Sequence, residues 1–206
     1  MDKHISFTSK INFVDYTAFT RLNQKGYNIG FRHDVPNIMK DRDFYTMGVR
    51  TCTGGGLVIP YREAEGFHFW DDLTNIKNFN EIVNKLFRFV KNPERGLLVG
   101  SKNLETNKYS IPQFKKLKQV FQDRLQHLTC FEEHQHRSSE TNLSYSLDTD
   151  TWTINTRYWE NKNPHTVKDI NSLLEAFKHV KIAKGDRLFF NGKEVDIKLY
   201  PEIFTQ

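Results

Sequence analysis

Cys52 and His68 both lie in a segment that is typical of β-structure, T-M-G-V-R-T-C-T-G-G-G-L-V-I-P-Y-R-E-A-E-G-F-H-F-W. We expect three strands in this part of the chain, over residues 43–50, 57–61 and 66–70. Cys52 and His68 are 68 − 52 = 16 positions apart. A chain that reverses near the midpoint brings such positions face to face on adjacent antiparallel strands.

A thiol beside an imidazole predicts nucleophilic catalysis. An ordinary cysteine has a pKa of about 8.5, and a neighbouring imidazole shifts the thiol toward the thiolate. The thiolate adds to an amide or ester carbon, the imidazole transfers the protons, and water then hydrolyses the thioester. The sequence therefore predicts a cysteine hydrolase with Cys52 as nucleophile and His68 as general base and acid.

Backbone N–H groups near the cysteine are the expected donors to the oxyanion of such a reaction. We assign this role to the segment around Thr51 and Thr53, which precedes a flexible glycine triplet. Gly54 and Gly55, with Gly56, lack side chains, so a substrate backbone can approach them closely. Three aromatic side chains are expected to form the walls of the site: Phe67, Phe69 and Trp70.

The elements that must position these residues follow from hydrophobic spacing. Helices are predicted over 14–23, 81–90, 112–128 and 167–180. Further strands are predicted over 27–31 and 96–99, and hairpins pair 143–148 with 152–159 and 188–190 with 195–197. The last hairpin has Asn191-Gly192 as its turn signal. The sum is an α/β (α+β) fold, with helices packed on a mixed or antiparallel sheet.

Composition favours one folded domain over residues 1–206. Seventeen phenylalanines and 37% hydrophobic residues suffice for a sizeable core. The net charge of +5 suits an acidic protein partner as well as a nucleic acid. No run approaches the ~20 apolar residues of a membrane span, and the start, M-D-K-H-I-S-F, lacks the apolar core of a secretory signal. We expect cytoplasmic synthesis, with both cysteines, Cys52 and Cys130, reduced.

The run Thr46-Met47-Gly48-Val49-Arg50-Thr51-Cys52, followed by Gly66-Phe67-His68-Phe69, resembles the chemoreceptor glutamine deamidases of the CheD family. The cytotoxic necrotizing factor toxins have a similar cysteine–histidine arrangement. The resemblance covers residues 43–103, where Leu98-Val99-Gly100-Ser101-Lys102-Asn103 is similar to a further segment of the family. It implies Cys52 as nucleophile, His68 as general base and acid, and Thr46 as the polar residue that assists the histidine.

The resemblance further implies a three-layer α/β sandwich and a cofactor-independent hydrolase that deamidates glutamine to glutamate in a protein substrate. Arg50 stands where the family has glycine, so the chain fits a divergent member, such as a bacterial effector or virulence toxin that acts on a host protein. Its location would be a bacterial cytoplasm or, after signal-independent export, a host cell. Transfer of the acyl group to an amine instead of water, which is transglutamination, stays open.

Other readings of the sequence remain open beside this one. One alternative is a non-enzymatic module with the same fold that binds a protein or a nucleic acid. A nucleic acid would contact a basic face, although no base-reading motif accompanies it. The residues of this face are Lys115, Lys116, Lys118, Arg124, Lys178, Lys181 and Lys184. A zinc site is conceivable at His127, Cys130, His134 and His136, although the spacing matches no known zinc module, and we expect no metal. His33-Asp34 is more typical of a loop cap than of a catalytic triad.

Overall fold

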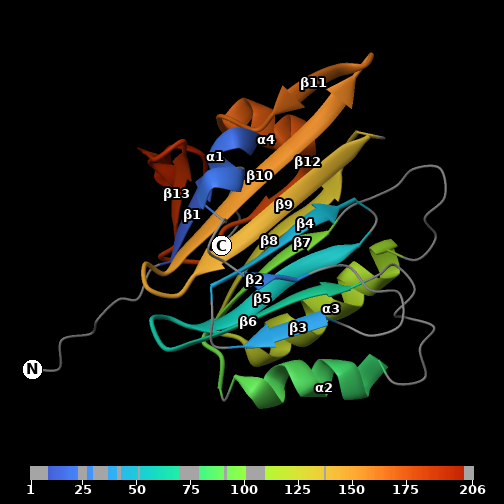
Figure 1. Cartoon of the computed structure of the whole chain (residues 1–206), viewed down its shortest axis with the longest axis vertical. Helices are drawn as coiled ribbons and strands as arrows, with labels where there is room; N and C mark the ends of the chain where they lie inside the picture. Colours follow the sequence, from blue (N-terminus) through green and yellow to red (C-terminus); the bar gives the residue numbers. More distant parts are fainter. Residues whose placement is uncertain are drawn as a thin grey trace, which may run out of the picture.

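The computed structural model shows three layers: an eight-stranded sheet, a six-stranded sheet, and two helices on the far side of the second sheet, while two further helices contact the strand over residues 151–160 (Figure 1). The residues that the structure describes are 9–22, 27–29, 37–40, 43–50, 52–69, 79–90, 92–100, 110–136 and 138–201. The expected α+β sandwich of mixed sheets and packed helices is confirmed, with the strands divided between two sheets.

The eight-stranded sheet joins strands from both ends of the chain. Its strands are β1 (Lys10–Phe13), β2 (Tyr27–Asn28), β4 (Phe44–Val49), β9 (Ser139–Ser146), β10 (Thr151–Glu160), β11 (Asn163–Thr166), β13 (Arg187–Phe190) and β14 (Lys193–Val195). The strand order is β14-β13-β1-β10-β9-β4-β2, and β11 extends β10 as a hairpin. Strand β1 is parallel to both β10 and β13, whereas β9 and β10 are antiparallel.

The six-stranded sheet carries the cysteine–histidine segment. Its strands are β3 (Asn37–Lys40), β5 (Thr53–Ile59), β6 (Glu63–Phe69), β7 (Arg95–Gly100), β8 (His127–His134) and β12 (Phe177–Lys181). They follow the order β12-β8-β7-β5-β6-β3, in which β7 and β8 are parallel. Strands β5 and β6 form an antiparallel hairpin that reverses just after Ile59.

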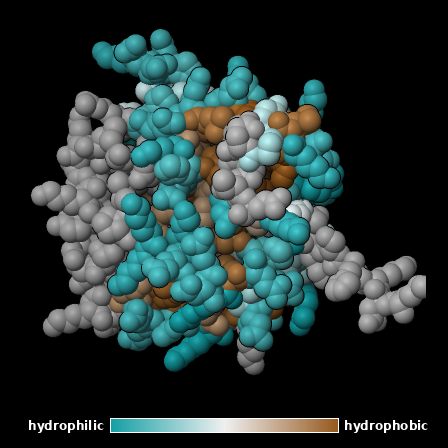
Figure 2. All heavy atoms as spheres, turned by 180° about the vertical axis from the view of Figure 1, so that it is seen from behind, coloured by the Kyte–Doolittle hydropathy of each residue, from teal (hydrophilic) through white to brown (hydrophobic). Residues whose placement is uncertain are grey.

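The helices are α1 (Tyr16–Leu22), α2 (Phe79–Phe89), α3 (Ser110–Arg124) and α4 (Ile170–Ala176), with a short 3₁₀ helix η3 (Ile197–Leu199). Helices α2 and α3 cover one face of the six-stranded sheet (Figure 1), and their apolar side chains share a core with Phe67 and Phe69. None of the described helices is long and apolar enough to cross a membrane. Seen from behind, the surface is largely hydrophilic, with hydrophobic residues visible between the polar ones (Figure 2).

The pleat of β6 sends successive side chains into different layers. Phe67 and Phe69, whose ring centroids lie 4.6 Å apart, belong to the core under α2 and α3. On the other face, a Cβ added at Gly66 would collide with the ring of Phe44 in β4. His68 lies two positions after Gly66, so its imidazole faces the eight-stranded sheet.

Two predicted helices extend too far, while most other elements agree with the sequence. Helix α3 ends at Arg124, and Leu128 lies in β8. The predicted helix was too long because the apolar residues keep their helical spacing across the boundary and hide the start of the strand. Helix α4 is capped by Asp169 and ends at Ala176, after which residues 177–181 form β12 at the sheet edge. The closing hairpin and its Asn-Gly turn are confirmed, with left-handed φ values of 49° at Asn191 and 77° at Gly192. Its second strand is Lys193–Val195 instead of 195–197, because the turn has only two residues, and Ile197 begins η3.

Candidate active site

Thr46 and His68 meet in the space between the two sheets. The Oγ1 atom of Thr46 on β4 lies 2.6 Å from Nδ1 of His68 on β6, and both side chains are almost fully buried. The same hydroxyl donates a hydrogen bond of 2.9 Å to the carbonyl oxygen of Ile29. The resemblance assigned Thr46 to assist the histidine, and the structure places it in contact with the ring.

The hydrogen bonds of Thr46 determine the tautomer of His68. A hydroxyl has one proton, and Thr46 gives its proton to Ile29, so toward the imidazole it can only accept. Nδ1 of His68 therefore carries a hydrogen, and Nε2 of the neutral ring carries the lone pair. This tautomer is the one in which Nε2 can take a proton from a thiol.

Burial sets the charge of the imidazole. It lowers the pKa of His68 from its ordinary 6.5 to about 4, because the charged form loses its hydration. The ring is thus neutral at pH 7. A neutral imidazole can accept the proton of a thiol during the reaction. It does not fit a resting ion pair of thiolate and imidazolium, in which the ring would be charged.

Cys52 lies immediately before β5, on the face that carries His68. In the β5–β6 ladder Thr53 is opposite Phe69 and Gly54 is opposite His68. Cys52 is two residues before Gly54, so its side chain points to the same side as that of His68, and it belongs to the core between the sheets. If this register continues one residue beyond Thr53, Cys52 is a diagonal neighbour of His68, a relationship with a typical separation of roughly 7–8 Å. The expected reversal of the chain near the midpoint between them is confirmed.

The glycine triplet has a role different from the expected one. Gly54 and Gly55 lie inside β5 and pair with β6 on one side and β7 on the other, so their backbone N–H groups belong to the ladders rather than to an oxyanion site. A Cβ at Gly54 would come within 2.8 Å of Val49, and one at Gly55 would collide with the carbonyl oxygen of Leu97. Gly54 therefore permits close approach of the other sheet, and Gly55 permits close approach of the neighbouring strand β7.

Most of the remaining predicted site residues also have structural roles or lie outside the described residues. Thr53 is fully buried and paired on both sides, so it too is committed to the sheet. Phe67 and Phe69 face the helices and do not form walls around the imidazole. Thr51 and Trp70 lie outside the described residues.

Two contributions to the site were missed from the sequence. One is the carbonyl oxygen of Ile29, whose role has no side-chain signal. The other is a β-bulge in β4, where Met47 and Gly48 together stand opposite Asn142 of β9. The glycine between Met47 and Val49 is the signal that could have revealed it, since glycine within a strand often marks a bulge.

The alternative zinc cluster is not brought together. His127 and Cys130 are an odd number of positions apart on β8 and so project to opposite faces of the sheet. Burial raises the pKa of Cys130 to about 12, so it stays a protonated thiol. Among the described residues, no group of three or more His, Cys, Asp or Glu side chains could hold a metal ion. His33-Asp34 lies outside these residues.

Three of the seven residues predicted to form the basic face make contacts within the molecule. Lys118 of α3 forms a 2.6 Å ion pair with Glu132, and Lys116 lies 4.1 Å above the ring of Phe79. The guanidinium of Arg124 lies 4.8 Å from the ring centre of Phe87. These cations cover the surface of their own helix layer, which is the ordinary structural role of such residues.

Comparison of the sequence with protein-family models and with curated proteins found no match.

Proposed function

We propose that this protein is a cysteine-dependent glutamine deamidase acting on a protein substrate, as its resemblance to the CheD and cytotoxic necrotizing factor enzymes implies. The observation that carries the proposal is the hydrogen bond between Thr46 and Nδ1 of His68, on the face of the β5–β6 hairpin that also carries Cys52. This bond orients the imidazole and holds Nε2 as a proton acceptor.

The reaction begins when Nε2 of His68 takes the thiol proton and Sγ of Cys52 bonds to the carboxamide carbon of a glutamine side chain. The carbonyl oxygen becomes an oxyanion, which backbone N–H groups stabilise. When the intermediate collapses, the C–N bond breaks, and the imidazolium protonates the departing ammonia. The product of this half-reaction is a thioester between Cys52 and the substrate.

Water completes the cycle. His68 takes a proton from water, the hydroxide adds to the thioester carbon, and the C–S bond breaks. The substrate leaves as glutamate, and the thiol is restored by the proton that His68 holds. Thr46 acts through His68 as a positioning residue, since its oxygen accepts from Nδ1–H in both charge states of the ring.

The site lies close to the surface even though its side chains are buried. Cys52 is 4% exposed, whereas Arg50, two residues earlier, has a side chain that is 64% exposed. The nucleophile thus lies where the chain enters the sandwich. We propose that a single glutamine side chain reaches it from a protein surface.

A non-enzymatic binding module with the same fold is the second candidate function. The burial of Cys52 and its membership of the core between the sheets favour it, because buried cysteines are commonly small apolar residues of a core. The two functions differ in the reactivity that they predict for Cys52.

The direct test of deamidation uses bacterial and host-cell lysates as substrate mixtures. Each is incubated with the purified protein or with its Cys52→Ala variant, and glutamines converted to glutamate are located by mass spectrometry. We expect conversions that only the wild-type protein produces. A labelled primary amine, added in parallel, separates transglutamination from hydrolysis. Identical conversions with the variant would contradict a role for the thiol.

A further inference from the structure

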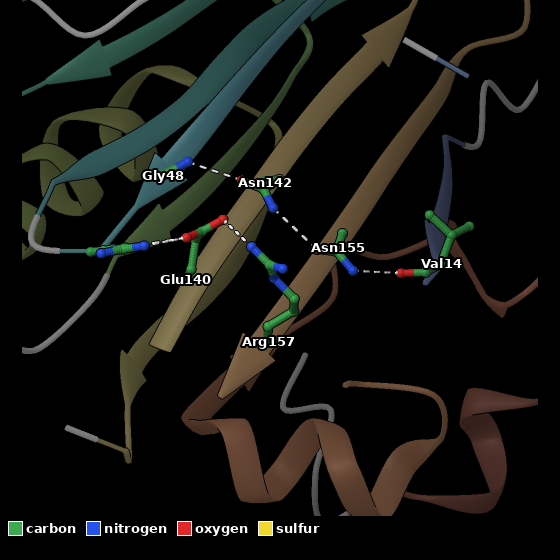
Figure 3. Close-up of polar contacts among 7 residues, drawn as sticks. Val14, Gly48, Glu140, Asn142, Asn155 and Arg157 are labelled. Carbon is green, nitrogen blue, oxygen red and sulfur yellow. Dashed lines mark hydrogen bonds and ion pairs between the residues drawn. The ribbon is translucent and has the colours of Figure 1, made fainter. Parts of the chain in front are cut away.

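We infer that a frame of two hydrogen-bonded rungs on the outer face of the eight-stranded sheet positions the segment between Thr46 and Cys52 for catalysis (Figure 3). The inner rung runs through Asn142 and Asn155, and the outer rung through Glu140 and Arg157. Their function is to hold the short stretch of chain that carries the nucleophile from one sheet to the other. The inference rests on the proposed function.

The inner rung is a directed chain of hydrogen bonds. The N–H of Gly48 donates to Oδ1 of Asn142 at 2.9 Å, and Nδ2 of Asn142 donates to Oδ1 of Asn155 at 3.1 Å. Nδ2 of Asn155 donates to the carbonyl oxygen of Val14 at 3.0 Å. Each amide thus has one orientation that satisfies its partners. Both asparagines are fully buried, where a lost partner is costly.

Gly48 is the point at which this rung acts on the site. It lies in the β4 bulge with a φ of 73°, a left-handed conformation that favours glycine. A bulge adds one residue and so reverses which side chains face inward. Thr46 and Val49 consequently both point toward Gly54, although they are three positions apart. Without the bulge, Thr46 and Val49 could not both face the hairpin that carries His68.

The outer rung holds the next residue of the same segment. Arg50 donates through Nη2 to Oε2 of Glu140 at 2.7 Å, and Arg157 donates to the other carboxylate oxygen at 2.9 Å. Burial alone would raise the pKa of Glu140, but the hydrogen bonds from both arginines lower it, so the carboxylate is charged. The guanidinium of Arg157 lies 4.1 Å from the ring centre of Tyr16.

The two rungs are built alike. Asn142 and Glu140 are neighbours on one face of β9, and their partners Asn155 and Arg157 stand directly opposite on β10. Each rung begins on the Gly48–Arg50 segment; the inner rung ends at Val14, between β1 and α1, and the outer rung ends at Tyr16, the first residue of α1. The segment between Thr46 and Cys52 is therefore held by hydrogen bonds at two residues, Gly48 and Arg50.

The test measures alkylation of both cysteines by iodoacetamide in the full chain, across pH, by mass spectrometry. Asn142→Ala removes the inner contact, and Arg50→Ala removes the outer contact at a side chain that is 64% exposed. Thr156→Val is the matched control, because it deletes a buried cross-strand hydrogen bond of 3.0 Å between the same two strands, on their other face. Cys130, which is buried under the helices, reports any general opening.

The rate that depends on His68 is the Cys52 rate minus the rate measured with His68→Gln. We expect each of Asn142→Ala and Arg50→Ala to lower it by at least about tenfold, since a 1 Å misplacement of reacting groups can cost about 10²-fold. Thr156→Val should match the wild type, and Cys130 should stay protected in all variants. Wild-type rates in both rung variants, or an equal loss in Thr156→Val, would overturn the inference and leave the proposed function intact. A wild-type rate that His68→Gln does not change would instead refute the proposed function.

Discussion

The hydroxyl of Thr46 and Nδ1 of His68 lie 2.6 Å apart, and the contact links one sheet to the other. The two residues are 22 positions apart in the chain, on β4 and β6. Because the hydroxyl also donates to the carbonyl oxygen of Ile29, the bond fixes both the orientation and the tautomer of the ring. The geometry of the candidate site thus depends on how the two sheets pack.

Thr46→Val should disable this arrangement while preserving shape. The valine cannot accept from Nδ1–H, so a buried donor is left unsatisfied, at a cost of about 1–3 kcal/mol, or the ring changes tautomer. We expect Cys52 alkylation at pH 7 to slow by about 10²-fold, the lower end of general acid–base effects. Thr46→Ser should retain most of the rate.

Long-range ¹H–¹⁵N correlation spectra of the imidazole provide the structural readout for these variants. The wild type and Thr46→Ser should show the proton on Nδ1 of His68. A Thr46→Val protein with the same tautomer and the wild-type alkylation rate would show that the hydroxyl does not orient the ring.

The lowered pKa of His68 predicts a particular pH dependence of stability. The folded pKa, about 4, is below the unfolded value of 6.5. The unfolded chain binds more protons between these values, so the contribution of His68 to stability is complete above pH 6.5 and is lost as the pH falls through 4. At pH 4 the loss should be on the order of 3 kcal/mol.

Urea unfolding of the wild type and of His68→Gln between pH 7.5 and pH 4, a range set by roughly these two pKa values, isolates this effect. Other titrating groups contribute equally to both proteins. The difference between their free energies of unfolding should shift against the wild type as the pH falls. A difference that stays constant across the range would mean that His68 has an ordinary pKa in the folded protein.

Gly55→Ala should be strongly destabilising. The added Cβ would collide with the carbonyl oxygen of Leu97 on the neighbouring strand and lie 2.8 Å from Cζ of Phe67. Because the collision is with backbone, we expect a loss of about 3 kcal/mol or more in the free energy of unfolding. Gly48→Ala is the comparison, since its Cβ meets nothing within 4 Å and only the left-handed backbone is strained. It should cost about 1–2 kcal/mol. Equal losses would contradict the packing role of the triplet.

The sequence predicted the cysteine–histidine hairpin but not the place of its glycines. Spacing and a turn after Ile59 suffice to bring positions 52 and 68 to one face of two strands. The triplet resembles a flexible turn because glycine has no side chain to show the period of a strand. The reason for glycine at Gly54 and Gly55 is the close approach of other elements, which local sequence does not encode.

The positioning frame was hidden for a related reason. Asn142 and Asn155 alternate with apolar residues along their strands, and such alternation predicts a face in contact with water. Both side chains are instead buried, and Asn155 is bonded to the carbonyl oxygen of Val14. A distant segment of the chain supplies that partner, so only the folded structure shows that the face is covered.

Whether His68 activates Cys52 is decided by the rates at which iodoacetamide modifies the two cysteines of the native protein. At pH 7 we expect Cys52 to react at least about tenfold faster than Cys130, with the advantage lost in His68→Gln. The slow rate of Cys130 serves as the internal reference for the Cys52 rate in each protein, because burial keeps the Cys130 thiol protonated. If both cysteines react equally slowly and His68→Gln changes neither rate, then Cys52 is a structural residue of the core and the proposed hydrolase is wrong.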